Sequence, residues 1–357
     1  NFVPTYDLMQ PIPYLPLDLQ FIYNFLKRGE NLLIVDSLEN SSIDVQDKIN
    51  HLISKNNNKK KGKLIFREGD IRNEIWLKKI FEEFKIAKNP IKTVFHFAGL
   101  KSVEESTHIP LKYWDINVSG TINLLNIMRE NNCFNLIFSS SAMIYKQNSS
   151  QKFKEDSELN PANPYAYTKY TIEKILDNLH KSEPSKWRIA NLRYFNPAGA
   201  HPSGLIGDNP KGKPANLFPA IIHTLKNEKN ELSIFGNNWP TKDGTCIRDF
   251  IHIMDLANAH IAANDLLNLE KPQIISLNIG TGFGTSVLNI IKTFEKVNNC
   301  KINYKFDQRR KGDLSFIVAD NKYAINKLNW SPKRDLEDIC RDTWNWFQNN
   351  KREIKNI

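Results

Sequence analysis

Tyr165 and Lys169 lie four residues apart in the segment NPYAYTK, which spans residues 163–169. Asn163 is suited to cap a helix and Pro164 to occupy its first position, so the segment predicts a helix with the tyrosine and lysine on one face. To act as a base at neutral pH, a phenol must lose roughly 3 units of pKa, about 4 kcal/mol, which nearby positive charge could supply. Taken alone, the spacing also fits a surface tyrosine and lysine on an amphipathic helix.

A serine run precedes this pair in the chain. The segment FSSSA at 138–142 follows an apolar stretch that predicts a strand, so the serines should lie at the carboxyl edge of a parallel sheet, where α/β proteins bind ligands. Ser141 is the candidate hydroxyl for sharing a proton with a substrate, and a simple turn is the alternative. A strand-end serine followed by the YxxxK spacing predicts a catalytic triad of Ser141, Tyr165 and Lys169.

Short apolar runs alternate with helix-period segments through the first half of the chain. The runs predict buried parallel strands at 31–35, 63–66, 93–97, 136–139 and 188–194, with helices near 73–84, 111–131 and 164–180. After residue 196 the pattern changes to Gly- and Pro-rich loops with helices near 217–227, 255–267, 286–297 and 336–348. We expect an α/β fold, with a doubly wound Rossmann-type sheet in residues 1–195 and a smaller α+β substrate-binding domain in residues 196–357, parts of which pack back on the first.

Bulk composition limits the function classes. The 357 residues carry a formal net charge of +10, which favours acidic ligands such as nucleotide diphosphates. A lysine-rich run at 56–63 fits a solvated loop better than a nucleic-acid patch. The four cysteines lack metal-ligand spacing, and no apolar stretch is long enough to cross a bilayer. We expect a cytoplasmic protein with no metal, nucleic-acid or membrane partner.

Longer motifs give the chain a family resemblance from about residue 20 onward. They are EGDIRN at 68–73, HFAGLK at 96–101, NVSGT at 117–121, RYFNPAGAHPSG at 193–204, DGTCIRDFIH at 243–252 and RRKGD at 309–313. With the triad, they resemble the extended short-chain dehydrogenases, specifically the UDP-galactose (UDP-glucose) 4-epimerase family. The resemblance implies NAD as cofactor, a UDP-hexose as substrate, and a homodimer joined through the helices near 111–131 and 164–180.

The resemblance also assigns cofactor-binding positions. Asp36 ends the second predicted strand, where its carboxylate would accept hydrogen bonds from the adenosine ribose and repel a 2′-phosphate, which favours NAD over NADP. A cap on the strand loop is its alternative role, and a structural role is as well supported as cofactor binding for Asn117. The other matching positions are Asn40, Ser41, Asp70, Ile71, Phe97, Ala98, Gly99, Lys101, Tyr165, Lys169 and Phe195.

On the substrate side, the resemblance assigns Arg248 and Arg310 to the diphosphate, a role that suits planar, permanently charged donors. Asp313 matches a ribose contact and Phe235 a uridine contact. The remaining matching positions are Ser141, Asn196, Asn216 and Leu217. If the phosphates are held firmly and the hexose loosely, a 4-keto sugar can rotate about its bond to the diphosphate after it loses hydride and before the hydride returns to its other face.

Related nucleotide-sugar enzymes are the nearest alternative. The dehydratases of this group carry an acidic pair after the strand-end hydroxyl, where this chain has Ala142 and Met143, so the acid needed for elimination is missing. Ile317 matches the position that controls entry of N-acetylated sugars. Its intermediate size leaves that preference open.

The N-terminus departs from the family pattern. No glycine precedes Gly29, although the family has a GxxGxxG phosphate loop near positions now held by Ile12, Leu15 and Asp18. Interleaved prolines remove backbone donors, and Asp18 would repel a pyrophosphate. Either residues 1–28 come from a misassigned gene start, or the protein is a cofactor-poor binding relative.

Overall fold

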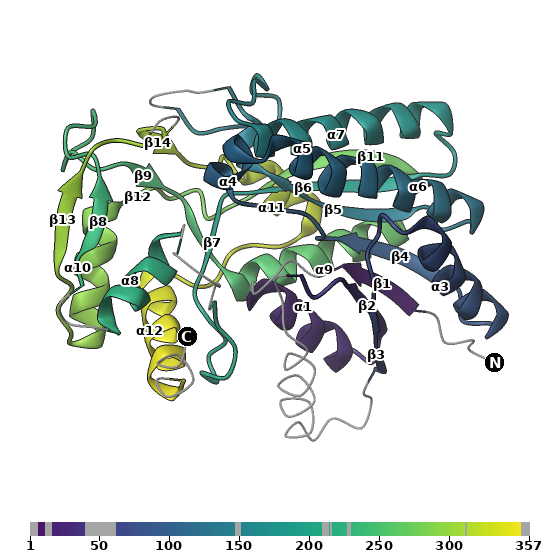
Figure 1. Cartoon of the computed structure of the whole chain (residues 1–357), viewed down its shortest axis with the longest axis horizontal. Coiled ribbons are helices and arrows are strands. Elements are labelled where there is room, and N and C mark those ends of the chain that lie inside the picture. Colours follow the sequence, from purple (N-terminus) through teal and green to yellow (C-terminus); the bar gives the residue numbers. More distant parts are fainter. Residues whose placement is uncertain are drawn as a thin grey trace.

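A parallel seven-stranded sheet forms the centre of the molecule in the computed structural model (Figure 1), with strand order β11-β6-β5-β4-β1-β2-β3. The structure describes residues 6–10, 16–39, 62–146, 151–208, 214, 216–226, 230–310 and 313–350. The strands are β1 (Tyr6–Gln10), β2 (Asn31–Asp36), β3 (Leu64–Glu68), β4 (Ile91–His96), β5 (Asn135–Ser141), β6 (Arg188–Tyr194) and β11 (Gln273–Ile279). This order is that of a doubly wound nucleotide-binding fold, so the predicted fold class is confirmed.

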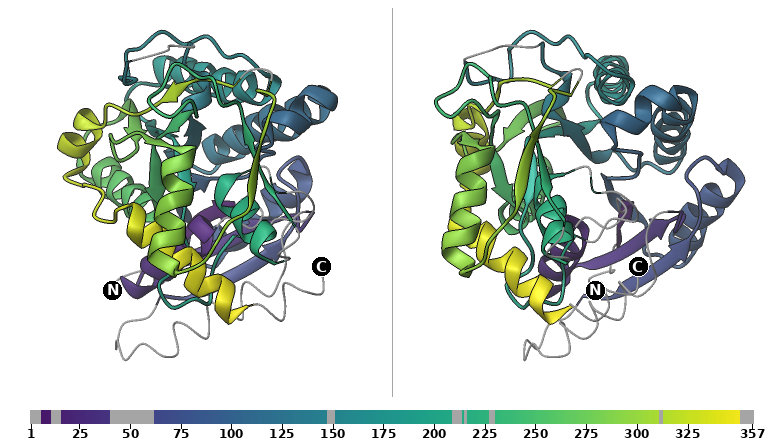
Figure 2. Two further views of the ribbon diagram at one scale, coloured as in Figure 1. Left: turned by 90° about the vertical axis from the view of Figure 1, so that its left-hand side faces the viewer. Right: turned by 60° about the vertical axis from the view of Figure 1, so that its left-hand side comes forward.

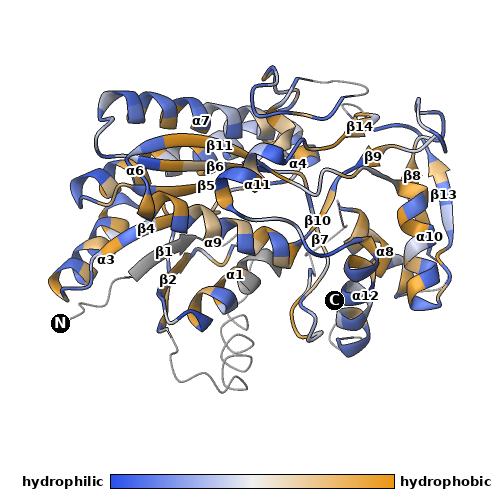
Figure 3. Cartoon of the chain, turned by 180° about the vertical axis from the view of Figure 1, so that it is seen from behind, coloured by the Kyte–Doolittle hydropathy of each residue, from blue (hydrophilic) through white to orange (hydrophobic). Residues whose placement is uncertain are grey.

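Helices cover both faces of the sheet. One face carries α3 (Glu74–Ile86), α6 (Gly120–Glu130) and α7 (Pro164–Ser182), reached through α4 (Val103–His108), α5 (Pro110–Tyr113) and the π-helical turn η1 (Trp114–Ser119). The opposite face carries α1 (Pro16–Lys27), α9 (Ile253–Leu269) and α11 (Lys322–Leu328). Coloured by hydropathy, the strands between the two helical layers are mostly apolar, as expected of a sheet buried on both faces (Figure 3).

All of the strands predicted from apolar runs are present, as β2 to β6, but the sequence pattern missed the other two strands of this sheet. β1 lies between β2 and β4, with Leu8 opposite Leu33 on one side and Val94 on the other. Its signal was hidden because the expected glycine-rich turn does not follow it. β11 comes from the second half of the chain and pairs in parallel with β6, which makes it the strand at one edge of the sheet.

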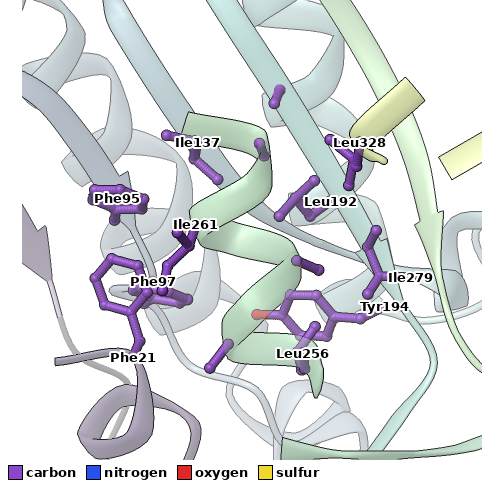
Figure 4. Close-up of a cluster of buried hydrophobic side chains, with 14 of the residues drawn as sticks. Phe21, Phe95, Phe97, Ile137, Leu192, Tyr194, Leu256, Ile261, Ile279 and Leu328 are labelled. Carbon is purple, nitrogen blue, oxygen red and sulfur yellow. The ribbon is translucent and has the colours of Figure 1, made fainter. Parts of the chain in front are cut away.

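The main core under the sheet joins segments that are far apart in sequence. Phe21 of α1 packs its ring 4.4 Å from that of Phe95 and 5.9 Å from that of Phe97. Leu256 and Ile261 of α9 belong to the same cluster of buried side chains (Figure 4). Each such side chain contributes about 1.5–3 kcal/mol through burial. The helix predicted near 255–267 therefore supports the nucleotide-binding sheet.

A smaller lobe lies beside the sheet (Figure 2). Its strands β8 (Leu232–Phe235) and β13 (Tyr304–Asp307) pair in parallel, and β8 shares a core with its helices. Those helices are α8 (Leu217–Leu225), α10 (Val287–Asn298) and α12 (Leu336–Asn349), close to the predicted ranges. Short strands connect the two lobes: β7 (Asn196–Ala198), β9 (Ile247–Arg248), β10 (Phe250–His252), β12 (Thr285–Ser286) and β14 (Phe316–Ile317).

Candidate functional site

Helix α7 begins as its sequence predicts. The Asn163 side-chain oxygen accepts a hydrogen bond from the backbone N–H of Ala166 at 2.9 Å, and Pro164 is the first helical residue. This cap fixes the start of the helix and places Tyr165 in its first turn and Lys169 one turn later. The predicted tyrosine and lysine therefore share one face of an ordered helix.

The three residues that the sequence predicts as a catalytic triad lie together at the carboxyl end of β5. Ser141 is the last residue of that strand and is hydrogen-bonded to the side chain of Tyr165. Lys169 is buried and donates from Nζ to the backbone carbonyl of Ser139 at 2.8 Å. Its ammonium also lies 4.9 Å from the centre of the Phe138 ring. One strand end thus contacts both members of the YxxxK pair.

Burial sets the protonation states of this pair. It raises the pKa of the Tyr165 phenol above its usual value, and the hydrogen bond from Ser141 opposes that rise by favouring the phenolate. Burial lowers the pKa of the Lys169 ammonium to about 7. The chain alone therefore keeps Tyr165 protonated near neutral pH. Positive charge brought into the site, together with the Ser141 hydrogen bond, is what would make it a base.

A cleft opens at the carboxyl ends of β2, β3 and β4. Its lining includes five of the predicted cofactor residues: Asp36, Asp70, Ile71, Ala98 and Gly99. The rest of its lining is Val35, Ser37, Glu39, Gly69, Leu100 and Ile116. This is the edge at which doubly wound folds bind dinucleotides.

The acidic residues of the cleft are held in place by short-range contacts. Asp36 is buried at the end of β2, and its Oδ1 accepts the backbone N–H of Leu38 at 2.7 Å. Asp70 accepts hydrogen bonds from the guanidinium of Arg72, which lowers the pKa of its carboxyl group. Asp70 is therefore ionised at neutral pH. A carboxylate fixed at the end of the second strand fits a ribose diol and disfavours a 2′-phosphate, so the residues present fit NAD.

Asn117 serves as a structural bridge. Its side chain accepts the N–H of Leu100 at 2.7 Å and donates to the Leu100 carbonyl and to Thr168 Oγ, both at 3.0 Å. Gly99 makes this approach possible, because it has φ +151° and a Cβ there would lie 2.9 Å from the Asn117 oxygen. Of the two roles left open for Asn117, these contacts support the structural one, which ties the loop after β4 to helix α7.

The residues predicted for the nucleotide of the substrate gather in the smaller lobe. The Arg310 guanidinium lies 4.6 Å from the centre of the Phe235 ring, and its Nε donates to Asp313 at 3.0 Å. Arg248 is buried, with Nη1 donating to the carbonyl of Leu314 at 2.8 Å and Nη2 3.7 Å from Asp313. An aromatic ring, a carboxylate and two guanidinium groups from separate segments therefore form one cluster.

The remaining predicted positions lie around these groups. The Phe97 side chain points into the core shown in Figure 4, so it can face a ligand only through its backbone. Phe195 is buried in a small cluster with Ile317 and Tyr145. Others occupy the substrate lobe and the cofactor loop: Asn196 begins β7, Asn216 directly precedes α8, Leu217 begins α8, and Lys101 follows the cleft loop. Asn40 and Ser41, and residues 11–15 with two of the three positions where phosphate-binding glycines were expected, lie outside the described residues, whereas the third position, Asp18, lies in α1.

Sequence reasoning missed a buried ion pair directly behind the triad. Glu173 lies one further turn along α7 from Lys169, and its Oε2 is 2.6 Å from Nη2 of Arg193 on β6. Ser140 donates to the same carboxylate at 2.5 Å. The available signal was the i, i+4, i+8 spacing of Tyr165, Lys169 and Glu173, which places all three on one helix face.

The described residues also bear on metal binding and on membrane crossing. They contain no group of three or more His, Cys, Asp or Glu side chains arranged to hold a metal ion. No helix in the described ranges is long and apolar enough to cross a membrane.

Comparison with known proteins first gives the class. The family model described as GDP-mannose 4,6 dehydratase matches residues 20–343, most of the chain. Curated relatives then narrow the family. A UDP-glucose 4-epimerase from Pisum sativum is 41% identical over 330 residues, covering 92% of each chain, and one from Bacillus subtilis is 40% identical, covering 92% of this chain and 93% of its own. The chain belongs to the UDP-glucose 4-epimerase family of extended short-chain dehydrogenases.

Solved structures agree with that assignment. A UDP-glucose 4-epimerase from Stenotrophomonas maltophila, with bound NAD and formylated UDP-arabinopyranose, superposes with a TM-score of 0.90 at 36% identity, covering 98% of this chain and 99% of its own. The enzyme from Bifidobacterium longum, in complex with NAD+ and UDP, gives a TM-score of 0.88 at 35% identity, covering 97% of this chain and 99% of its own. Both cover the cleft and the substrate lobe.

Proposed function

We propose that this chain is an NAD-dependent UDP-glucose 4-epimerase that interconverts UDP-galactose and UDP-glucose through a 4-keto sugar. The assembly of Ser141, Tyr165 and Lys169 beside the nucleotide cleft carries the proposal. The chemistry needs a base at the sugar 4-hydroxyl and a hydride acceptor next to it. A triad at the carboxyl end of β5 supplies the first, and a fold of this class supplies the second by binding NAD.

Residues of the first lobe would hold the cofactor. Asp36 is placed for the adenosine ribose, while Asp70, Ile71, Ala98 and Gly99 line the space beyond it. NAD held there would supply the acceptor for the C4 hydride and the donor for its return. The positive charge of its oxidised ring would also favour the Tyr165 phenolate, and so offset part of the rise in pKa that burial causes.

Tyr165 then takes the proton of the 4-hydroxyl, and Ser141 shares that proton through its hydrogen bond to the phenol oxygen. Lys169 keeps positive charge close to the phenol while anchored to the Ser139 carbonyl. The same tyrosine returns the proton after the keto sugar has turned its other face, so no net proton is consumed. General acid–base catalysis of this kind contributes about 10²–10⁴-fold.

Turning the keto sugar requires a firmly held diphosphate and a loosely held hexose. Arg248 and Arg310 supply two permanent charges for the phosphates, and Phe235 offers its ring to the uracil. Asp313 already accepts a hydrogen bond from Arg310, so it orients that anchor, and its carboxylate would contact the ribose. The nucleotide end thus carries most of the polar contacts.

A 4,6-dehydratase would need an acid after Ser141. The following turn η2 (Ala142–Ile144) offers only Ala142, Met143 and Ile144, and Ala142 packs in an apolar cluster with Tyr145. With no carboxyl group at these positions, elimination across C5 and C6 has no proton donor there. Epimerisation therefore fits the site better than dehydration.

The experiment is to purify the chain, measure its bound NAD, and follow conversion of UDP-galactose with and without added NAD+. We expect conversion in the wild type and a loss of about 10²–10⁴-fold in kcat for Tyr165→Phe, with unchanged folding. A folded wild type that converts no UDP-galactose at saturating NAD+ would refute the proposal. It would instead support the cofactor-poor binding relative that the glycine-free N-terminus suggests.

A homodimer and a cytoplasmic location are further parts of the proposal. Helices α5, η1, α6 and α7 expose large apolar side chains, including Leu111 at 82%, Trp114 at 37%, Ile122 at 43% and Tyr167 at 44%. Apolar groups gathered on neighbouring helices favour a protein contact. The four cysteines are free thiols, which suits a reducing compartment.

A further inference from the structure

We infer that Glu173, together with Ser140 and Arg193, is a positioning residue for the catalytic pair: it sets the register of helix α7 against the end of β5. The inference rests on the proposed epimerase function. Three consecutive serines of β5 each contact one of three residues on the same face of α7. Ser141 bonds Tyr165, the Ser139 carbonyl accepts Lys169, and Ser140 donates to Glu173, the last at 2.5 Å.

The Glu173 carboxylate is held by hydrogen bonds from both Ser140 and Arg193. This carboxylate accepts Nε and Nη2 of Arg193 at 2.9 and 2.6 Å, and neither side chain is more than 6% exposed. Although burial alone would lower the pKa of Arg193, its bonds and charge interaction with Glu173 outweigh that effect and raise it. A fork-shaped contact of this kind fixes direction as well as distance.

Arg193 on β6 links this contact to β11, the neighbouring strand at the edge of the sheet. Its Nη1 donates to the Tyr145 hydroxyl at 3.0 Å and to the carbonyl of Glu155 at 2.8 Å. The Tyr145 hydroxyl in turn donates to Oδ1 of Asn278 on β11 at 2.6 Å. The carboxylate on α7 is thereby tied to β5, β6 and β11 together.

This network has no direct part in the reaction. Glu173 and Arg193 are paired with each other and buried, so neither is available to a sugar or a phosphate. What the network can change is the position of α7, because a rotation or slide of that helix moves Tyr165 away from Ser141 and Lys169 away from the Ser139 carbonyl at once. A shift of about 1 Å at reacting groups costs on the order of 10²-fold in rate.

Two variants test the role. Ser140→Ala removes one hydroxyl and keeps the ion pair, while Glu173→Gln keeps the shape and removes the charge. Asp177→Asn is the matched control, since that carboxylate lies on the same helix but forms an exposed pair with Lys181. Each full-length protein, with NAD, is assayed for kcat and KM for UDP-galactose, for the pH profile of kcat, and for thermal unfolding.

We expect kcat to fall about tenfold or more in Ser140→Ala and about 10²-fold in Glu173→Gln, with KM within about twofold of wild type. The ascending, acidic limb of the kcat profile should also move to higher pH, because a displaced Tyr165 loses its hydrogen bond from Ser141 and its pKa rises. Asp177→Asn should match the wild type. If Glu173→Gln does not fold, Ser140→Ala decides the matter.

A merely structural network gives a different result. The variants would then unfold at lower temperature, yet folded enzyme would keep the wild-type kcat and pH profile, and the inference would be overturned. A wild type without conversion would instead refute the epimerase proposal, so the two failures are distinguishable.

Discussion

Replacing Lys169 with methionine should make the folded protein more stable while it abolishes most activity. Lys169 is 3% exposed, its Nζ donates to the Ser139 carbonyl, and burial lowers its pKa from 10.5 to about 7. That difference, at 1.36 kcal/mol per unit, corresponds to about 5 kcal/mol of unfavourable free energy for the charged form. At pH 7, where half of the folded protein carries the charge, the cost is about 4 kcal/mol.

The sign of the pH dependence follows from the two pKa values. Between pH 10.5 and about 7 the unfolded chain binds a proton that the folded protein does not, so the free energy of unfolding of the wild type falls as the pH falls. The methionine variant has no ionisable group at this position, so its free energy of unfolding does not fall in this way. It gives up one hydrogen bond worth about 1 kcal/mol, so we expect it to be about 3 kcal/mol more stable at pH 7 and nearly equal to the wild type by pH 9.5.

Urea unfolding of nucleotide-free protein at pH 7 and pH 9.5 measures this difference. Lys174→Met is the control, because Lys174 lies on the same helix but is exposed, with Nζ 5.2 Å from the Tyr170 ring. Its effect should stay within about 0.5 kcal/mol at both pH values. A Lys169→Met protein no more stable than the wild type at pH 7, or with a gain that persists at pH 9.5, would refute the burial argument.

Three further predictions concern the cofactor loop, the substrate anchor and the assembly. Gly99→Ala should lower the free energy of unfolding by about 1–3 kcal/mol in urea titrations, because the new Cβ meets the Asn117 oxygen at 2.9 Å and the φ of +151° disfavours side chains; an unchanged midpoint would contradict it. Arg310→Ala should raise KM for UDP-galactose about tenfold and leave kcat nearly unchanged, since it removes a positive charge that would contact the phosphates equally in the bound substrate and in the transition state. An equal loss in kcat would count against that role. Leu111→Glu should convert a dimer to a monomer in light scattering, because it places a charge on the exposed apolar face.

The sequence predicted the parts of the fold that have strong local signals. Continuous apolar runs gave β2 to β6, and Asn163 with Pro164 gave the start of α7. β1 was missed because its usual marker, a glycine turn, does not follow it. The position of β11 at the sheet edge depends on pairing with β6, which no local pattern encodes.

The residues of the candidate site also fall into those with a local sequence signal and those that depend on contacts between distant segments. Tyr165, Lys169 and Ser141 were recognisable because spacing along one helix and position at a strand end are visible in sequence. Glu173 was not, although it shares their spacing, since its role depends on Arg193 and Ser140 from two other strands. The structure supplies what the sequence lacked, namely which strand residues meet the helix face.

The placement of α9 and β11 has a consequence for how the protein is made. Phe21 and the rest of α1 lie against α9, and β6 has β11 as its neighbour, so the sheet at the start of the chain lacks a cover and an edge until residue 279 has been synthesised. At 5–20 residues per second, synthesis from the end of α1 at Lys27 to the end of β11 at Ile279 takes on the order of tens of seconds, and the apolar surface of α1 stays uncovered for most of that time. Chaperone demand during translation, and loss of the whole protein on truncation before β11, should therefore be features of this chain.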